Sequence, residues 1–259
     1  MSRVTSFFQA TGEILKLLAE SVYWSKATFR NREKVATQML EIGNNTLPIA
    51  ALISIFIGGV LALQSGPTLA LFGLQENIGG LVGLSMVREL GPVMASILVV
   101  GRVGSAMTAE IGSMSVYEEI DALKTMDINP VRFLVMPRVL ASFIALPVLV
   151  IYMDVIGWFG GAIVSAANPD VGVSFNSYYR NLSEFVEFED VVNGLVKAAV
   201  FGIIISTVCC YVGLNTRGGP REIGTSVTRA VVLSFVLILI FDYFITRLLL
   251  LLGLQTRLL

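Results

Sequence analysis

Residues 78–107 read IGGLVGLSMVRELGPVMASILVVGRVGSAM, and this segment sets the class of fold. It is long, apolar and rich in glycine, yet Arg88 and Glu89 stand side by side in its first half. A helix needs about 20 apolar residues to cross the hydrocarbon core of a bilayer, so this segment is long enough to span one with tilt. It therefore predicts a membrane-spanning helix that carries two adjacent charges inside the membrane.

The composition agrees with a membrane location. Hydrophobic residues make up 55% of the 259 residues, charged residues 14%, and the mean hydropathy is +0.78. Soluble domains have about 45–50% apolar and about 25% charged residues, so the composition is that of an integral membrane protein. The chain has no histidine, which removes the commonest metal ligand and general base, and we expect no metal site. A net charge of −1 without a dense Lys/Arg run argues against a nucleic-acid partner.

Five apolar segments are long enough to cross a membrane. They cover residues 47–63, 78–107, 133–167, 191–214 and 227–252. Residues 68–74 form a shorter apolar piece, which is either an extension of the first helix or a re-entrant segment. The sequence therefore predicts an all-α integral membrane protein with five transmembrane helices, and an odd number of spans puts the termini on opposite sides.

Residues 1–45 carry a different pattern. Apolar side chains recur at helical spacing, at Val4, Phe7, Phe8, Ile14, Leu15, Leu18 and Val22. Glu13, Lys16 and Glu20 interrupt the apolar run, which excludes the uncharged core of a signal peptide. The pattern favours a helix lying in the membrane interface, with its basic residues facing anionic headgroups. An amphipathic helix packed on another protein is the alternative.

The loop charges predict the orientation, because basic residues concentrate in cytoplasmic loops. They are Arg3, Lys16, Lys26, Arg30, Arg32 and Lys34 before the first span, Lys124 and Arg132 after the second, and Arg217 and Arg221 after the fourth. The other connections, 64–77 and 168–190, carry only Arg180. We therefore expect the N-terminus and residues 108–132 in the cytoplasm and the C-terminus outside, although Arg257 in the tail argues weakly the other way.

The segment between the second and third spans predicts a short amphipathic helix. Ser115 and Glu118 match a capping box at its start, and Asp127-Ile128-Asn129-Pro130 is a stop signal. Its apolar stripe consists of Val116, Ile120, Leu123 and Met126. Such a helix rests on the bilayer or inserts into a groove on a cytoplasmic partner. Glu118, Glu119 and Asp121 disfavour anionic lipid, so we favour the partner.

Several stretches resemble the MlaE/YrbE permease family of lipid-transporting ABC systems. They are VRELGPV (87–93), GRVGSAMTAEIG (101–112) and EEIDALKTMDINP (118–130), together with LALQ (61–64) and the lysine of GLVKAAVFG (194–202). These motifs are long and free of low-complexity bias, and the resemblance runs from about residue 38 to 252. Residues 1–35 resemble the family only in their general amphipathic pattern, not in their sequence.

The resemblance implies a fold and a set of partners. The fold is a single permease domain over residues 1–259, with an interfacial helix in 1–45 and a five-span core in 46–255. The partners are a second copy in a homodimer, cytoplasmic ABC ATPase subunits, a periplasmic ring of MCE proteins and a phospholipid, and the resemblance leaves room for a small STAS-type cytoplasmic subunit. The cellular location is the inner membrane of a bacterium with an outer membrane, with a plastid as the alternative, and the C-terminus is periplasmic.

The coupling to ATP is implied to occur through the helix at 115–126. The residues that would contact the ATPase are Glu118, Glu119, Ile120, Leu123 and Met126. The chain itself has no G-x-x-x-x-G-K-[ST] motif, so ATP and Mg²⁺ are expected on the partner and no cofactor on this chain. A lipid-modifying enzyme is disfavoured, because the chain has neither histidine nor a G-x-S-x-G motif. An ion-coupled secondary transporter that uses Glu89 or Asp242 as a proton site is the remaining alternative.

The charged pair is the centre of the predicted substrate site. A charge at the middle of a membrane helix costs about 2.5–3.5 kcal/mol, and adjacent residues on a helix point about 100° apart, so Arg88 and Glu89 each need a separate partner. Lys197, Arg229 and Asp242 also lie within predicted spans, and the surplus of positive charge would suit a lipid phosphate. A structural network without substrate contact is the alternative, and we assign Arg229 and Asp242 to a charge network or gating.

The predicted substrate site also needs apolar walls for acyl chains. Its full set is Arg88, Glu89, Gln64, Lys197, Leu61, Leu69, Phe72 and Leu90. Gly91-Pro92 follows the charged pair and predicts a local loosening or kink of the second span.

Overall fold

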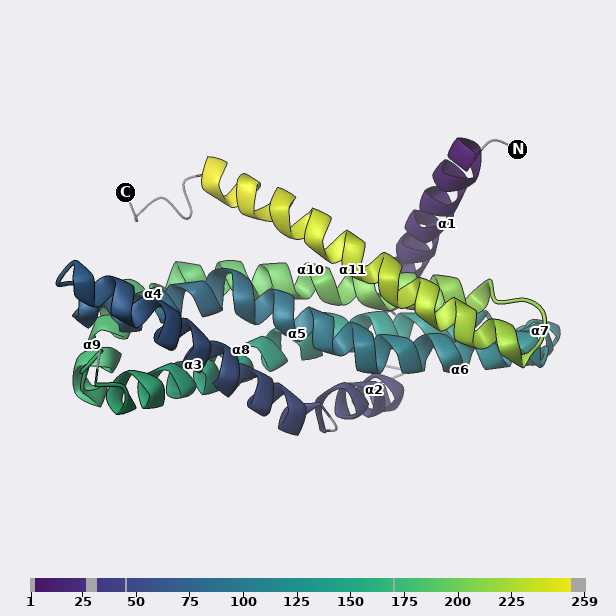
Figure 1. Ribbon diagram of the computed structural model, residues 1–259. Coiled ribbons are helices and arrows are strands. Elements are labelled where there is room, and N and C mark those ends of the chain that lie inside the picture. Colours follow the sequence, from purple (N-terminus) through teal and green to yellow (C-terminus); the bar gives the residue numbers. More distant parts are fainter. Residues whose placement is uncertain (1–2, 27–31, 45, 170, 253–259) are drawn as a thin grey trace. The chain divides into compact units, whose positions relative to one another are not determined.

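The computed structural model describes residues 3–26, 32–44, 46–169 and 171–252, and within these ranges every regular element is a helix. Figure 1 labels these helices along the chain. The helices are α1 (Arg3–Trp24), α2 (Arg32–Asn44), α3 (Leu47–Leu71), α4 (Ile78–Ser85), α5 (Gly91–Val99), α6 (Ser105–Val116), α7 (Glu119–Thr125), α8 (Met136–Ala167), α9 (Phe175–Phe185), α10 (Phe188–Leu214) and α11 (Pro220–Leu251). The predicted all-α class is confirmed.

Five stretches among the described residues are long and apolar enough to cross a membrane. They are Leu47–Leu71, Gln75–Val116, Val131–Ala167, Phe188–Leu214 and Pro220–Leu251. The first includes Pro67, and α3 continues without a break to Leu71, so residues 68–71 extend the first helix and do not re-enter the membrane. The five-span prediction is therefore confirmed, and each of these helices is longer than the apolar run alone indicates.

The second and third spans contain π-turns, in which one extra residue widens the helix. They cover Met86–Leu90, Val100–Gly104 and Val131–Val135. The first is followed by Gly91, whose N–H donates to the carbonyl oxygen of Met86 five residues earlier. The loosening that Gly91-Pro92 predicts thus takes the form of a π-turn, a feature that is frequent at functional sites.

The chain divides into two compact units. One consists of residues 1–45, 96–145 and 199–239, and the other of residues 46–95, 146–198 and 240–259. Helices α5, α8, α10 and α11 each contribute a part to both units, because the unit boundaries fall inside these helices.

The unit that contains α3 is held together by close backbone contacts at glycines. A Cβ atom on Gly58 would lie within bonding distance of the Gly157 carbonyl, and one on Gly160 would overlap the backbone of Ile55. Larger residues would therefore separate α3 from α8. Small residues allow membrane helices to pack at this distance, where van der Waals contact replaces the hydrophobic effect as the driving force.

Helix α9 was not anticipated, because residues 168–190 read as a connection. It packs on α4, where Gly79 leaves room for the backbone of Tyr178 and Gly80 for the side chain of Phe185. The Gly80 N–H donates to Asn181 Oδ1 at 2.7 Å. The glycines of IGGLVG therefore form the surface on which α9 packs, and α9 covers the start of the second span.

The other unit contains the N-terminal region as two helices, α1 and α2, where a single interfacial element was expected over residues 1–45. Leu17 of α1 packs with Ile111, Leu134, Val139 and Cys210 in a buried cluster. The predictions for Arg3, Val4, Phe7, Arg30 and Arg257 fall on side chains or residues outside those that the structure describes.

The predicted capping box at Ser115 is wrong. Helix α6 continues through Val116, and Ser115 Oγ donates to the carbonyl oxygens of Leu214 and Thr216. Helix α7 begins at Glu119, after Glu118 adopts a left-handed backbone with φ of 61°. Because the Ser115 hydroxyl bonds to α10 and to the turn that follows it, it does not cap a new helix. Helix α6 therefore continues past Ser115, and the break between α6 and α7 falls at Glu118.

Candidate functional site

The charged pair lies on the π-turn Met86–Leu90, and each residue has its own partner. Arg88 Nε lies 2.7 Å from Asp190 Oδ1 of α10. Glu89 Oε2 lies 2.8 Å from Lys197 Nζ, also on α10. Adjacent helical residues point in different directions, so the two cannot form a good pair with each other. The expectation that each needs a separate partner is confirmed.

Lys197 is the centre of this charge cluster, which we define as Arg88, Glu89, Asp190, Lys197, Asp242 and Thr246. Its side chain is fully buried. The ammonium donates to Glu89 Oε2, to the Arg88 carbonyl oxygen at 2.9 Å and to Thr246 Oγ1 at 2.7 Å. Asp242 Oδ1 lies 3.3 Å away. All three ammonium protons therefore have acceptors, which is what a buried lysine requires.

The contact between Lys197 and the Arg88 carbonyl follows from the sequence. In a helix the carbonyl of residue 88 would accept from the N–H of residue 92, but residue 92 is proline and has none. The Lys197 ammonium donates to this carbonyl instead. The Gly91-Pro92 pair that follows the charges thus creates the acceptor that the lysine uses.

Gly194 allows α10 to approach the π-turn closely enough for this contact. A Cβ atom on Gly194 would lie 2.2 Å from the Val87 carbonyl oxygen. Gly194 precedes Lys197 by three residues and so lies on the same side of α10. In the sequence GLVK, Gly194 therefore lets α10 approach the π-turn, and Lys197 on the same side of the helix places its ammonium there.

With every group ionised, the cluster carries more negative than positive charge. It contains three carboxylates, on Glu89, Asp190 and Asp242, and two cations, on Arg88 and Lys197. The predicted surplus of positive charge is therefore wrong for this cluster. The predicted fifth member, Arg229, is an exposed residue of α11 and forms no ion pair with any residue that the structure describes.

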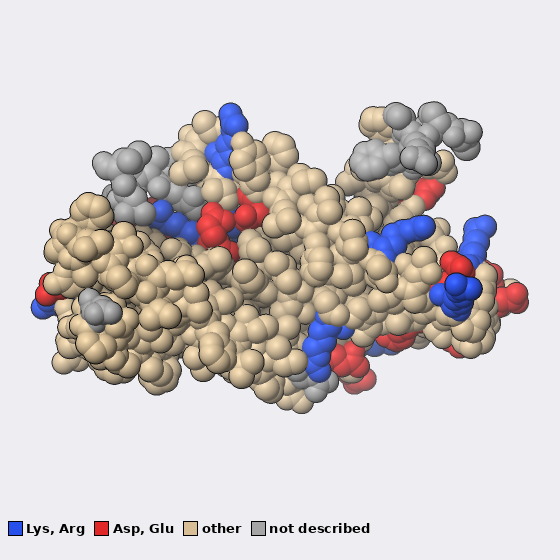
Figure 2. All heavy atoms as spheres, viewed as in Figure 1, with Lys and Arg blue, Asp and Glu red and all other residues tan. Residues whose placement is uncertain are grey.

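Exposure differs strongly within the cluster. The Glu89 side chain is 40% exposed, against 16% for Arg88 and 0% for Lys197. Figure 2 shows acidic and basic side chains gathered beneath the C-terminal half of α11, on a surface made otherwise of uncharged residues. Glu89 therefore presents a carboxylate outward, while the buried Lys197 ammonium contacts it from inside.

Three polar residues of this region escaped sequence reasoning. Asp190 lies seven residues before Lys197, and Thr246 four residues after Asp242, so each falls on the same helix face as a predicted residue. That spacing was a usable signal. Asp154 of α8 is a third: it is buried, its Oδ1 has no hydrogen-bond partner among the described residues, and a Cβ on Gly91 would meet it.

The predicted apolar walls separate into two groups. Leu61, Leu69 and Leu90 are partly buried and pack against a core formed by residues such as Ile78 and Met86. Phe72 is 75% exposed, and Gln64 is also exposed. The structure thus brings three of the leucines to one core and leaves Gln64 and Phe72 on the surface. Their contact with a substrate stays a prediction.

The predicted coupling residues also have two environments. Ile120 is buried beside Leu17 of α1, and Leu123 packs partly against the same cluster. Glu118, Glu119 and Met126 are exposed. Ile120 and Leu123 of the predicted stripe therefore face the protein's own interior, while the acidic residues and Met126 face outward.

The sequence has relatives of known class. The profile of the family described as Permease MlaE matches residues 35–248. A probable ABC transporter permease of Rickettsia typhi is 45% identical over 217 residues, which cover 83% of this chain and 82% of the relative. The intermembrane phospholipid transport system permease protein MlaE of Haemophilus influenzae is 33% identical over 245 residues, which cover 94% and 93%. The chloroplastic protein trigalactosyldiacylglycerol 1 of Arabidopsis thaliana is 36% identical over 230 residues, which cover 89% and 63%.

The five apolar helices and these relatives define the class of protein as a multi-pass membrane permease of the ABC transporter type. The family is equally clear, because its profile covers most of the sequence and full-length relatives share a third or more of its residues. The chain belongs to the MlaE permease family.

Proposed function

We propose that this chain is the transmembrane permease subunit of an ABC transporter that moves phospholipid between the inner membrane and a periplasmic MCE carrier, and so maintains outer-membrane lipid. The observation that carries the proposal is the Glu89 carboxylate, which is 40% exposed while the cation behind it is fully buried. The name of the Haemophilus influenzae relative, which refers to phospholipid transport, supports the choice of substrate.

The geometry supports different roles for the members of the cluster. The Glu89 carboxylate can accept hydrogen bonds from the ammonium or hydroxyl groups of a lipid headgroup. Lys197, Thr246 and Asp242 position it, since the lysine has no exposed surface for a ligand. Leu90 follows Glu89 directly and, with Leu61 and Leu69, offers apolar surface for acyl chains.

The N-terminal region supports a cytoplasmic, interfacial placement. Phe8, Leu15 and Val22 of α1 are all more than half exposed, and their seven-residue spacing places them on one face of the helix. An exposed apolar stripe of this kind is suited to the boundary between headgroups and acyl chains. Together with the loop charges, it supports a cytoplasmic N-terminus and a periplasmic C-terminus.

We further propose that α7 receives the ATPase, which holds the ATP and Mg²⁺. The exposed residues Glu118, Glu119 and Met126 would make the contact, and Ile120 and Leu123 would transmit movement into the unit in which they pack. Met126→Ser should weaken ATPase binding without lowering stability, whereas Ile120→Ala should lower stability by about 2–4 kcal/mol. Equal loss of stability in both variants would contradict this division.

The remaining partners are a second copy of the chain, the MCE ring and a STAS-type subunit. A Cβ atom on Gly101 would meet nothing within 4 Å, although Gly101, Ser105 and Ala109 form a small-residue face. Such a face suits close helix contact, which supports a homodimer. The whole chain would act as one permease domain, because four helices pass through both units.

Reconstitution tests the proposal. The chain and its ATPase partner are placed in donor liposomes, and transfer of labelled phospholipid to an MCE acceptor is followed with ATP or with a proton gradient. Glu89→Gln should reduce ATP-driven transfer at least about tenfold, as expected when a charge-assisted contact is lost. Arg229→Gln, which changes an exposed charge outside the cluster, is the matched control. Transfer driven by the proton gradient alone would favour the secondary-transporter alternative.

A further inference from the structure

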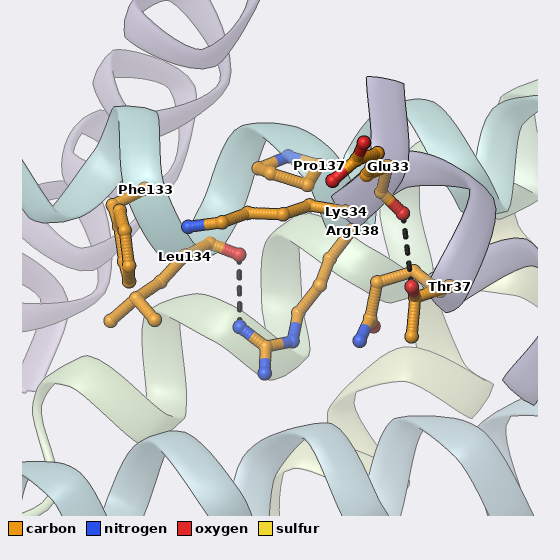
Figure 3. Close-up of a pocket in the computed structure, with 8 residues that line it drawn as sticks. Glu33, Lys34, Thr37, Phe133, Leu134, Pro137 and Arg138 are labelled. Atoms are coloured by element: carbon orange, nitrogen blue, oxygen red, sulfur yellow. Dashed lines mark hydrogen bonds between the residues drawn. The ribbon is translucent and has the colours of Figure 1, made fainter. Parts of the chain in front are cut away.

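A second site of mixed charge lies in the other unit, between α2 and the start of the third span. It is a pocket of about 370 Å³. Its lining residues are Glu33, Lys34, Thr37, Gln38, Phe133, Leu134, Pro137 and Arg138. Figure 3 shows the Lys34 side chain extending across the pocket with its ammonium directed toward Phe133. None of these residues belongs to the charge cluster around Lys197.

Lys34 places its ammonium against an aromatic ring, not against a carboxylate of any described residue. Its ammonium lies 2.9 Å from the centroid of the Phe133 ring, and it forms no ion pair with any residue in the described ranges. Partial burial lowers the pKa of Lys34, because some of its hydration is lost. The aromatic ring attracts the ammonium but does not neutralise it or accept its protons as an oxygen would. An anion placed here would supply both the counter-charge and a hydrogen-bond acceptor.

Arg138 adds a donor from the floor of the pocket. Its side chain is 5% exposed, its Nη1 donates to the Leu134 carbonyl oxygen at 2.9 Å, and its Nη2 lies 2.7 Å from Glu110. Its Nε is buried and has no hydrogen-bond partner among the described residues. Buried polar groups are almost always paired, so an orphaned guanidinium N–H in the wall of a pocket points to a ligand atom that accepts from it.

The pocket also carries one carboxylate and an apolar wall. Glu33 is exposed at the surface of the pocket and forms no ion pair with a residue that the structure describes. Phe133, Leu134 and Pro137 supply the apolar side. The pocket therefore combines two cationic donors, one anionic acceptor and hydrocarbon contact. A free inorganic anion would use only the two cationic donors.

We propose that this pocket binds the headgroup of an aminophospholipid, with its phosphate between Lys34 and Arg138 and its amine at Glu33. The glycerol end would rest on Phe133 and Pro137. Basic pockets beside membrane helices bind lipid phosphates in this way, and under the proposed orientation this one faces the cytoplasmic leaflet. The lipid would anchor α2 to the third span, and it would be a resident molecule separate from the transported one.

Photo-crosslinking tests the site directly. The full-length chain is reconstituted in bilayers containing an ethanolamine phospholipid with a photoreactive headgroup, and the labelled peptides are mapped by mass spectrometry. We expect labels within residues 33–38 and 133–138. Lys34→Gln should reduce this labelling about tenfold, the loss expected for a charge-assisted hydrogen bond, and Lys34→Arg should retain most of it. Lys16→Gln removes an equal charge from an exposed position on α1 and should have no effect.

The outcomes separate this site from the transported lipid. Because Glu89→Gln changes only the charge cluster, it should leave labelling of the pocket intact even where transfer is lost. Unchanged labelling in Lys34→Gln, or an equal loss in Lys16→Gln, would overturn the proposal. Displacement of the label by millimolar inorganic phosphate would also overturn it, since the pocket would then bind a free anion. Glu33→Gln should lower labelling by the ethanolamine lipid relative to a glycerol-headgroup lipid, and an equal effect on both would contradict the role of Glu33.

Discussion

Lys197 and Lys34 place the same side chain in two contrasting environments. Lys197 is fully buried and surrounded by oxygen atoms, with hydrogen bonds to Glu89, Thr246 and a backbone carbonyl. Lys34 is only partly buried and faces an aromatic ring, with no ion pair to any described residue. The comparison shows that a lysine whose donors are all used acts within the protein, whereas one with unused donors can take a ligand.

The largest expected effect comes from removing the cation of the first environment. Lys197→Met should lower the free energy of unfolding by about 3–5 kcal/mol, because Glu89 and Asp242 lose their shared counter-charge and the Arg88 carbonyl loses its donor. Thermal unfolding in detergent measures this, with Lys16→Met as the exposed control. A melting temperature equal to that of the control would mean that the cluster contributes nothing to stability.

The next largest effect tests how Lys197 reaches its acceptor. Gly194→Ala should destabilise the protein by about 1–3 kcal/mol, because the new Cβ would lie 2.2 Å from the Val87 carbonyl oxygen and force α10 away from the π-turn. Gly224→Ala on α11 is the matched control, since its Cβ would meet nothing within 4 Å. That control should be neutral or stabilising by up to about 1 kcal/mol, as alanine favours helix. Equal melting temperatures would contradict the close approach.

A smaller effect is expected from one hydrogen bond of the cluster. Thr246→Val removes the hydroxyl that accepts from Lys197 and donates to Glu89 at 3.1 Å, while nearly preserving shape. The cost should be about 1 kcal/mol, typical of a single intramolecular hydrogen bond. Chemical unfolding followed by tryptophan fluorescence can resolve this value. Thr246→Ser keeps the hydroxyl and should recover most of the loss; if it does not, the methyl packing matters more than the hydrogen bond.

The smallest effect is expected at Lys34. Lys34→Gln should change the free energy of unfolding by less than about 1 kcal/mol, the value of an exposed cation–π contact, even though it abolishes the proposed lipid contact. Measuring stability in delipidated detergent and again in bilayers separates the two contributions. A large loss in delipidated detergent would show that Lys34 supports the fold itself, and the contrast with Lys197 would then disappear.

Much of the fold was predictable because membrane spans have a strong, local signal. The length and hydropathy of residues 78–107 and the four other runs suffice to place five helices, since backbone groups in lipid must be satisfied within each helix. Helix α9 was missed because its pattern is amphipathic and its partner, the glycine face of α4, is distant in sequence.

The site was predictable in part for a similar reason. Charges within apolar runs identify Arg88, Glu89, Lys197 and Asp242, which the structure brings together. Arg229 is exposed and forms no ion pair with a described residue, which the sequence did not indicate because distance along a span does not say which face of the helix a side chain occupies. Its role in gating stays a prediction. The capping box at Ser115 failed because a serine hydroxyl can accept a helix N–H or donate to a distant carbonyl, and only tertiary contacts decide between them.

Each of the three π-turns contains an arginine, Arg88, Arg102 or Arg132. A π-turn holds one residue more than the α-helix around it, so deleting one residue there would restore regular helix and leave the two flanks in nearly the same orientation. Only the residues within the turn would change direction. In evolutionary terms the first π-turn lets the second span differ by one residue in length: a homologue one residue shorter at Met86–Leu90 would keep both flanks in register and lose only the bulge that carries Arg88 and Glu89.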